Sequence, residues 1–315
     1  MSLKQQVRDL AVTVLPTTAV DALKSARKIW RRRQWEKNVR DDPDARFTRA
    51  DLIAHMRDLG VEPGRDLMLH SSMRKVGFID GGAAEFIEAL REVIGPAATL
   101  LMPTYPMKVP LLEYMSDPTP FDMVEDRSYM GRITDTFRKL PGAKRSGHPT
   151  HSVAALGPGA EDYTGTHHLS QTPCGPGSPF ARLSAQGGQI LCVGIGIGKV
   201  SSHHTIEDQV EPFPIQVYHP DGLFTKTVRF PDGREVPVQT KIHSDEWTLL
   251  RVDNDEQAYN EVYRAMTGAG IIQEGHIGRA DAHLFRADDL DRVHADRLRR
   301  EGTTIYRLSA VRGKR

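Results

Sequence analysis

The densest group of residues that could do chemistry lies between positions 144 and 208. This stretch holds six of the thirteen histidines of the chain: His148, His151, His167, His168, His203 and His204. The sharpest local pattern is SSHHTIED, residues 201–208, which follows the apolar run QILCVG and a loop with glycines at positions 194, 196 and 198. A strand, a glycine-rich turn and then a helix place the first helical turn at the carboxyl end of a sheet, where ligands of open α/β proteins bind.

His204 and Glu207 are three positions apart, so both side chains project from one face of the expected helix. A neutral imidazole beside a carboxylate is the arrangement that a general base requires, because the carboxylate stabilises the imidazolium formed when a proton is taken. We therefore predict that His204 is a base and that Glu207 assists it. Spacing alone leaves open whether Glu207 bonds His204 or holds an incoming ammonium group, and the same spacing occurs on ordinary polar helix faces.

A zinc site is the competing interpretation of these histidines. Catalytic zinc usually has three protein ligands and one open position. Neighbouring helical residues point about 100° apart, so His203 and His204 cannot readily share a metal. His148 and His151 flank Pro149 in a stretch that predicts an extended loop, which could still supply ligands. We predict that no metal is bound, and a metal-dependent hydrolase is the alternative.

The two cysteines, Cys174 and Cys192, are too few for a disulfide scaffold or a four-ligand zinc site. A reducing, cytoplasmic location follows from this usage. Cys174 lies in a loop rich in proline and glycine, and Cys192 lies in an apolar strand-like run. We therefore expect no acyl-cysteine intermediate in the chemistry of this protein.

An alternation of strand-like and helix-like segments runs from Phe47 onward. Thr48 and Asp51 predict a capping box at the start of one helix, and Gly81-Gly82 precede another. The expected strands are residues 66–72, 98–103, 152–157 and 189–194, and the expected helices include 83–94, 254–266 and 287–300. Strand, loop, helix and strand in this order imply crossover connections in a parallel sheet.

A β-hairpin is expected around Pro231-Asp232-Gly233, because Asp-Gly suits a tight turn between strands. We expect this hairpin to join the parallel strands and make the sheet mixed. The predicted fold class is thus α/β, with three layers (αβα) around a central mixed, largely parallel sheet. Residues 47–315 should form one catalytic domain.

Residues 1–46 differ from this body in charge. The chain as a whole has 42 Lys and Arg against 41 Asp and Glu, so it carries no strong field that would favour nucleic acid. Residues 1–46 nevertheless hold eleven basic and six acidic residues. We predict a basic helical extension over residues 20–37 followed by a linker at 41–45.

The predicted extension has two interpretations. Its basic residues, with Leu23, Ile29, Trp30 and Trp35 among them, suit either a solvated helix or contact with a partner or an anionic membrane surface. No apolar run approaches the roughly 18 to 20 residues that a membrane helix needs. We expect a cytoplasmic protein, with the inner face of the membrane as an alternative position and a homo-oligomer left open.

Several blocks of the chain resemble the aminoglycoside 3-N-acetyltransferase family, and they occur in the order of that family over roughly residues 48–295. The blocks are HSSMRKVGFIDGGAAEFIEAL at 70–90, LMPTYP at 101–106, GAKRSGHPTHSVAALGP at 142–158, GSPFARL at 177–183, GQILCVG at 188–194, SSHHTIE at 201–207 and EGHIGRADAHLFRADDL at 274–290. The resemblance implies an α/β fold distinct from the GNAT acetyltransferases. It also implies acetyl-CoA as donor and direct transfer to a substrate amine.

The resemblance also implies roles for individual residues. The T-x-x-H-x-x-E pattern of the family falls on Ser201, His204 and Glu207, with the histidine as base. The H-x-S loop falls on His70, Ser71 and Ser72, and the R-S-x-H-P block on Arg145, Ser146, His148 and Pro149. Both loops are expected to hold coenzyme A, and hydroxyls and backbone N–H groups at a strand end can bind phosphate oxygens.

The expected acceptor is a small cationic amine. Acidic residues near the predicted cleft, Asp208 among them, suit such a molecule, and Ser201 and Asp208 are the predicted substrate contacts. Ser201 replaces the threonine usual in the family, and Ile206 replaces a small residue, which would reshape the acceptor pocket. An aminoglycoside antibiotic and an amino sugar of a cell-surface glycan both fit. A binding protein that lost turnover is a third possibility.

Overall fold

The computed structural model describes residues 30, 39 and 42–313 of the chain. The chain divides into two compact units, Met1–Arg46 and Phe47–Arg315. The helix predicted over residues 20–37 lies outside the described residues except for Trp30, whose side chain is exposed. Its contact with a membrane or partner therefore stays a prediction. Within the described ranges, no helix is both long and apolar enough to cross a bilayer.

The second unit is built on a seven-stranded mixed sheet with the order β11-β12-β8-β2-β4-β7-β6. Its strands are β2 (Leu67–Ser71), β4 (Leu100–Pro103), β6 (Lys144–Arg145), β7 (Val153–Leu156), β8 (Gln189–Val193), β11 (Gln273–Ile277) and β12 (Ala280–Arg286). β2 runs parallel to both β4 and β8, whereas the four outer pairings are antiparallel. The predicted α/β class and mixed sheet are confirmed. The expectation that the sheet is largely parallel is wrong, because only its three central strands run parallel and four of its six pairings are antiparallel.

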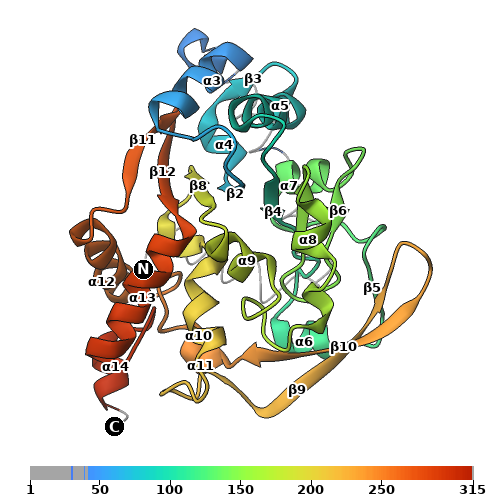
Figure 1. Cartoon of the computed structure of the whole chain (residues 1–315), viewed down its shortest axis with the longest axis vertical. Coiled ribbons are helices and arrows are strands. Elements are labelled where there is room, and N and C mark those ends of the chain that lie inside the picture. The colour runs from blue at the N-terminus through green and yellow to red at the C-terminus, as the bar shows by residue number, and fades with distance from the viewer. Residues whose placement is uncertain (1–29, 31–38, 40–41, 314–315) are drawn as a thin grey trace, which may run out of the picture. The chain divides into compact units, whose positions relative to one another are not determined.

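Helices cover both faces of this sheet, because its strands bury side chains on each side. Leu67, Leu69 and Leu191 belong to one core, shared with α3 (Arg49–Asp58), α5 (Gly82–Ile94) and α7 (Arg132–Phe137). Met68 and Ile190 belong to the other, shared with α8 (Ala160–Thr164), α9 (Pro179–Ala185), α12 (Glu256–Gly268) and α13 (Ala287–Glu301). The alternation follows from the two-residue period of a strand and gives the predicted three layers. Figure 1 shows α3 with α5, and α12 with α13, as neighbouring pairs.

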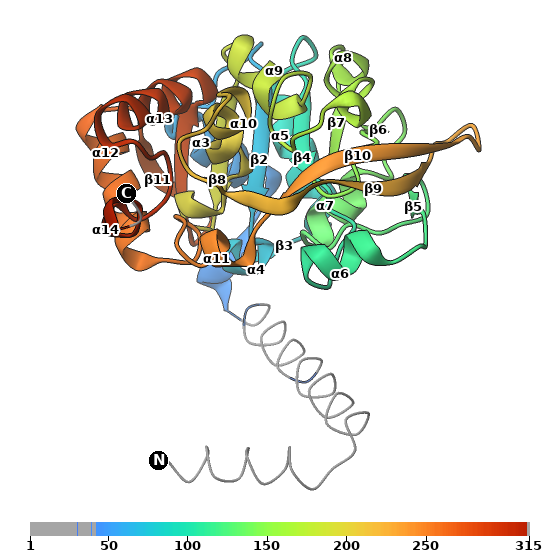
Figure 2. The same ribbon diagram turned by 90° about the horizontal axis from the view of Figure 1, so that it is seen from below.

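The predicted hairpin exists, but it does not join the central sheet. β9 (Tyr218–Arg229) and β10 (Glu235–His243) pair antiparallel around residues 231–233. With β5 (Phe121–Asp122) they form a separate three-stranded sheet. The hairpin has its own small core, in which Val228 and Val238 pack with Phe121 and Met123, so it needs no edge of the central sheet. The expectation that it makes the central sheet mixed is therefore wrong. Figure 2 shows the hairpin crossing in front of the strands.

The predicted helix starts agree with the structure. The Thr48 backbone N–H donates to Asp51 Oδ2 at 2.8 Å, and the Asp51 N–H donates to Thr48 Oγ1 at 3.2 Å, which completes the capping box of α3. The remaining elements are short: β1 (Arg46–Phe47), β3 (Phe78–Ile79), α4 (Met73–Val76), α6 (Leu111–Ser116), α10 (Thr205–Gln209), α11 (Asp245–Thr248), α14 (Leu308–Gly313), and the 3-10 helices η1 (Pro43–Ala45), η2 (His167–Leu169), η3 (Ile197–Lys199) and η4 (Ser201–His204). Two of these short elements, η4 and α10, carry Ser201, His204, Glu207 and Asp208.

Candidate active site

The glycine-rich loop after β8 brings the SSHHTIED segment to the carboxyl end of the central strands. Gly194 has φ +66°, and a Cβ there would lie 2.9 Å from the Cβ of Lys75 and 3.1 Å from the carbonyl oxygen of Ser72. A Cβ on Gly198 would lie 2.6 Å from the carbonyl oxygen of Val252. Glycine is therefore required at both positions, since any side chain would clash with the neighbouring backbone. The loop leads into η4 and α10, which carry His204 and Glu207.

His204, Glu207 and His243 form a buried cluster of side chains. His204 Nδ1 lies 2.9 Å from Glu207 Oε1, and His243 Nε2 lies 2.6 Å from the same oxygen. The two imidazole ring centroids are 4.5 Å apart. Glu207 is 1% exposed and His204 8%. Because a carboxylate only accepts hydrogen bonds, His204 carries its proton on Nδ1, which leaves Nε2 as a neutral acceptor.

The charges in this cluster favour an ionised carboxylate and a neutral imidazole. Burial lowers the pKa of His204, and the negative charge of Glu207 opposes this effect. Burial by itself would raise the pKa of Glu207, but His204 and His243 outweigh it and hold that pKa well below its usual range. The arrangement can therefore accept a proton on His204 Nε2 and stabilise the imidazolium through Glu207.

Ser201 and Asp208 flank the cluster and are bonded within the protein. The hydroxyl of Ser201 is hydrogen-bonded to the hydroxyl of Tyr105, and its carbonyl accepts from Cys174 Sγ at 3.3 Å. Asp208 Oδ2 accepts from the Cys174 backbone N–H at 2.6 Å, and Oδ1 accepts from the Tyr218 hydroxyl. Burial, followed by the charge of Glu207, raises the pKa of Asp208 to about 7. Asp208 thus holds the Cys174 loop and β9 against the helical turn of the base.

His70, Ser71 and Ser72 lie at the end of β2, next to β8. His70 pairs in register with Cys192 and Ser71 with Val193, and the Ser72 N–H donates to the Val193 carbonyl at 2.8 Å. His70 Nε2 and Ser71 Oγ are buried without a hydrogen-bond partner among the described residues. Burial, and secondarily His203, lower the pKa of His70 to about 3. These buried polar atoms without a partner mark the strand end as a candidate ligand position.

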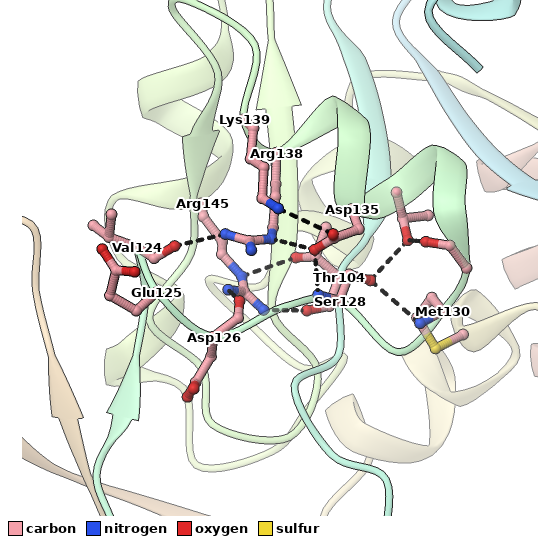
Figure 3. A network of polar contacts seen from close by, with 12 residues as sticks. Thr104, Val124, Glu125, Asp126, Ser128, Met130, Asp135, Arg138, Lys139 and Arg145 are labelled. Atoms are coloured by element: carbon pink, nitrogen blue, oxygen red, sulfur yellow. Dashed lines mark hydrogen bonds and ion pairs between the residues drawn. The ribbon is translucent and has the colours of Figure 1, made fainter. Parts of the chain in front are cut away.

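Arg145 and Ser146 lie apart from this loop, beside β4 and β7, and both are buried. Arg145 donates to backbone carbonyls of Thr104, Met123 and Asp126. Figure 3 shows its contacts with Thr104 and Asp126. Ser146 Oγ lies 2.9 Å from His167 Nδ1 and accepts from the Val153 N–H at 2.9 Å. Both side chains therefore hold loops of the fold together.

The other predicted histidines pack inside the protein. His203 Nδ1 lies 2.7 Å from His294 Nε2, and its Nε2 lies 2.9 Å from the Ile197 carbonyl oxygen. The rings of His148 and His167 are stacked at 4.5 Å. His151 packs on Tyr105 with ring centroids 4.6 Å apart. These contacts supply structural roles for histidines that sequence alone could not separate from His204.

His243 is the residue of the cluster that the sequence analysis missed. Among the described residues, His204, Glu207 and His243 are the one set of three whose potential metal-binding atoms lie within 4.8 Å of one another. Two histidines and a glutamate are also the ligand types of some zinc hydrolases. His243 ends β10, 36 residues after Glu207, and no local pattern marks it.

The buried cysteines contribute no nucleophile to this geometry. Burial raises the pKa of the Cys192 thiol above its usual range, and burial with the charges of Asp208 and Glu207 does the same for Cys174. Both side chains are therefore thiols at neutral pH, whereas the thiolate is the reactive form.

Comparisons with known proteins agree with this architecture. A family model described as aminoglycoside 3-N-acetyltransferase matches residues 68–299. Aminoglycoside N(3)-acetyltransferase III of Serratia marcescens is 31% identical over 254 residues, which cover 76% of this chain and 92% of the relative. A variant of aminoglycoside acetyltransferase AAC(3)-IVa in complex with apramycin has a TM-score of 0.65 and 30% identity, covering 81% of this chain and 93% of that one. AAC-IIIb in a binary complex with CoASH has a TM-score of 0.66 and 26% identity, covering 81% and 97%. This chain is therefore an acyltransferase that belongs to the aminoglycoside 3-N-acetyltransferase family.

Proposed function

We propose that this protein transfers the acetyl group of acetyl-CoA directly to a primary amine of an aminoglycoside or another amino sugar, with His204 as general base and Glu207 assisting it. The observation that carries the proposal is the bond between His204 Nδ1 and Glu207 Oε1, which leaves Nε2 as a neutral acceptor. Family membership supports the reaction class. The buried position of Glu207 supports its role as a fixed counter-charge.

The reaction needs a proton acceptor because an amino-sugar ammonium has no lone pair for attack. In the proposed step His204 Nε2 takes a proton from the amine as its nitrogen bonds to the acetyl carbon. The carbon–sulfur bond breaks, and the thiolate of coenzyme A leaves and takes up a proton. His243 donates to the oxygen of Glu207 that His204 also contacts, so it would orient the carboxylate toward the base. Holding both reactants together lowers the entropic part of the barrier.

Coenzyme A is proposed to bind at the end of β2. The complex of the similar AAC-IIIb with CoASH supports coenzyme A as the ligand, and the unpaired atoms of His70 and Ser71 support the position. Ser72 makes no capping bond to α4, so its hydroxyl is also available. The family resemblance predicts contacts of Arg145 and Ser146 with coenzyme A. Four of the five Arg145 donors are used inside the protein and the Ser146 hydroxyl lies 2.9 Å from His167 Nδ1, so neither contact is part of this proposal.

The acceptor is proposed to approach His204 from the side of Ser201 and Asp208. The apramycin complex of the similar AAC(3)-IVa supports an aminoglycoside, and a glycan amino sugar has the same ammonium chemistry. The two oxygens of Asp208 already accept hydrogen bonds. Burial also raises its pKa to about 7, so Asp208 would serve the acceptor site mainly by holding the Cys174 loop and β9 in place.

A free-thiol release assay tests the proposal. The full chain is incubated with acetyl-CoA and a panel of aminoglycosides, free amino sugars and nucleotide-linked amino sugars. Amine-dependent thiol release, with acetylated product found by mass spectrometry, supports acetyl transfer and names the acceptor class. No thiol release with any amine would contradict it and favour a binding protein.

A second candidate function is a metal-dependent hydrolase, because His204, Glu207 and His243 offer zinc-type ligands. Elemental analysis of the purified protein distinguishes the two. Stoichiometric zinc together with loss of activity in a chelator would favour the hydrolase. Acetyl transfer that survives chelation would favour His204 as a base.

A further inference from the structure

Arg145 is a buried arginine whose donors are used on protein atoms. Its Nη2 donates to the Thr104 carbonyl at 2.5 Å, Nη1 donates to the Met123 carbonyl at 3.3 Å and to the Asp126 carbonyl, and Nε donates to Thr104 Oγ1 at 3.3 Å. These are four of the five N–H donors of a guanidinium. The guanidinium also lies over the Phe121 ring, 4.8 Å from its centroid. One donor remains for any other ligand.

A second arginine holds the same segment of chain. Arg138 Nη1 donates to the Val124 carbonyl at 2.6 Å, and its Nε donates to Asp135 Oδ1 at 2.8 Å. Asp135 Oδ1 also accepts from the Ser128 N–H at 2.9 Å. Residues 123–128, here called the clamped segment, are thus fixed through their backbone from two sides, as the dashed lines of Figure 3 show.

The clamped segment is connected to the turn that carries the base. Immediately after it, the Tyr129 N–H donates to the Tyr105 carbonyl at 2.9 Å. The Tyr105 hydroxyl is bonded to the hydroxyl of Ser201, which precedes His204 by three residues. Thr104, which Arg145 holds, is the residue before Tyr105. Arg145 therefore fixes the two segments of chain that meet at Tyr105, whose hydroxyl contacts Ser201.

We propose that Arg145 is a positioning residue for the acceptor: it holds Thr104 and the clamped segment, and so keeps the Tyr105 hydroxyl against Ser201, and it does not contact coenzyme A. This inference rests on the proposed acetyl transfer to a cationic amine. The support for the acceptor is the bond of Tyr105 to Ser201, the predicted substrate contact on the turn of His204. The support against coenzyme A is that four of the five Arg145 donors are used inside the protein.

Arg145→Lys tests the inference, because lysine keeps the charge but loses the planar fork that reaches several carbonyls. For the acceptor with the lowest KM in the thiol-release screen, we expect KM to rise roughly tenfold, which corresponds to about 1.4 kcal/mol. kcat and the calorimetric Kd of coenzyme A should change by less than about threefold. Arg65→Lys is the matched control. Arg65 Nη1 also donates to a backbone carbonyl at 2.7 Å, and that carbonyl belongs to Gly187, which lies before the start of β8. It should leave all three constants unchanged.

Two results would overturn the inference. One is a tenfold weaker Kd for coenzyme A with an unchanged acceptor KM, which would make Arg145 a coenzyme A ligand. The other is no change in either constant. If Arg145→Lys does not fold, Arg138→Lys replaces it, because Arg138 holds the same segment through the Val124 carbonyl. The same rise in acceptor KM is then expected, and an unchanged KM would contradict the inference. A wild-type protein that acetylates no amine would instead contradict the proposed function itself.

Discussion

Two neighbouring histidines on one helical turn, His203 and His204, differ in their contacts and in their expected roles. His203 bonds His294 and the Ile197 carbonyl, is fully buried, and has no hydrogen-bonded carboxylate in the part of the chain that the structure describes. His204 bonds Glu207, which also accepts from His243, and keeps some exposure. Both lie in the 3-10 helix η4, where one step along the chain turns a side chain by about 120°, which is enough to separate a packing residue from a candidate base. A histidine becomes chemically useful here through its carboxylate partner and its free nitrogen, not through its position in a histidine-rich stretch.

Replacing the base should give the largest effect on activity. His204→Gln removes the nitrogen that accepts the proton, so we expect kcat to fall by roughly 10²- to 10⁴-fold. The Kd of coenzyme A, measured by calorimetry, should change by less than about threefold. A His204→Gln enzyme with near wild-type kcat would contradict the assignment of His204 as the general base.

Replacing the carboxylate should come next. Glu207→Gln keeps the shape of the side chain but removes the charge that stabilises the imidazolium, and we expect kcat to fall roughly a hundredfold. Steady-state kinetics against the same acceptor provide the measurement. Equal kcat values for Glu207→Gln and wild type would show that the carboxylate only packs the turn.

His243→Gln sharpens the comparison further. It weakens one hydrogen bond to a buried charge, an interaction worth about 1.5–3 kcal/mol, and should lower kcat roughly tenfold. The acid limb of the pH–rate profile should shift as well, because Glu207 would be held less firmly beside His204. A change in thermal stability alone, with the profile unmoved, would reduce His243 to a structural residue.

Low pH should act through His204 on kcat/KM and through His203 on the stability of the fold. Burial lowers the pKa of His204 from its usual 6.5, so the base is neutral above that value. As far as the protonation of His204 determines it, kcat/KM should therefore be constant above pH 6.5 and fall only at lower pH.

The second effect of low pH concerns stability. Burial lowers the pKa of His203 to about 4. Its contribution to stability is complete above pH 6.5 and is lost as pH falls toward 4, at up to about 1.4 kcal/mol per pH unit. Chemical denaturation at several pH values would measure it, and a pH-independent midpoint from 6.5 to 4 would contradict it.

His203→Gln should give the smallest effect on activity. It perturbs the bonds to His294 and Ile197, so the free energy of unfolding should drop by about 1–3 kcal/mol. kcat of the folded variant should stay within about threefold of wild type, which makes it the matched control for His204→Gln. A hundredfold loss of kcat at unchanged stability would show that His203 takes part in the reaction and is not only a packing residue.

Local patterns predicted the elements well because their signals are short-range. The capping box at Thr48, the buried strands around positions 68 and 191, and the Asp-Gly hairpin all depend on neighbouring residues. The place of the hairpin was wrong because edge pairing is decided by long-range packing, here against Phe121 and Met123. Sequence therefore gives the pieces of this fold more readily than their assembly.

The candidate site was predictable where its residues share one helical turn. The spacing of His204 and Glu207 predicted a common face, and the structure adds a direct bond between them. His243 and the carbonyls held by Arg145 come from distant segments, so no spacing could reveal them. The family resemblance pointed to Arg145, but only the folded chain shows which atoms its guanidinium reaches.

The order of the strands also bears on how this protein is made. β8 leads to the turn of the base, and its outer neighbour β12 comes from residues 280–286, while His294 follows on α13. A ribosome releases the amino end first, so a nascent chain carries an open edge on β8 until residues 280–286 have been made. A chain that stopped before β12 would therefore expose this edge and be an inert, aggregation-prone product and not a shorter enzyme.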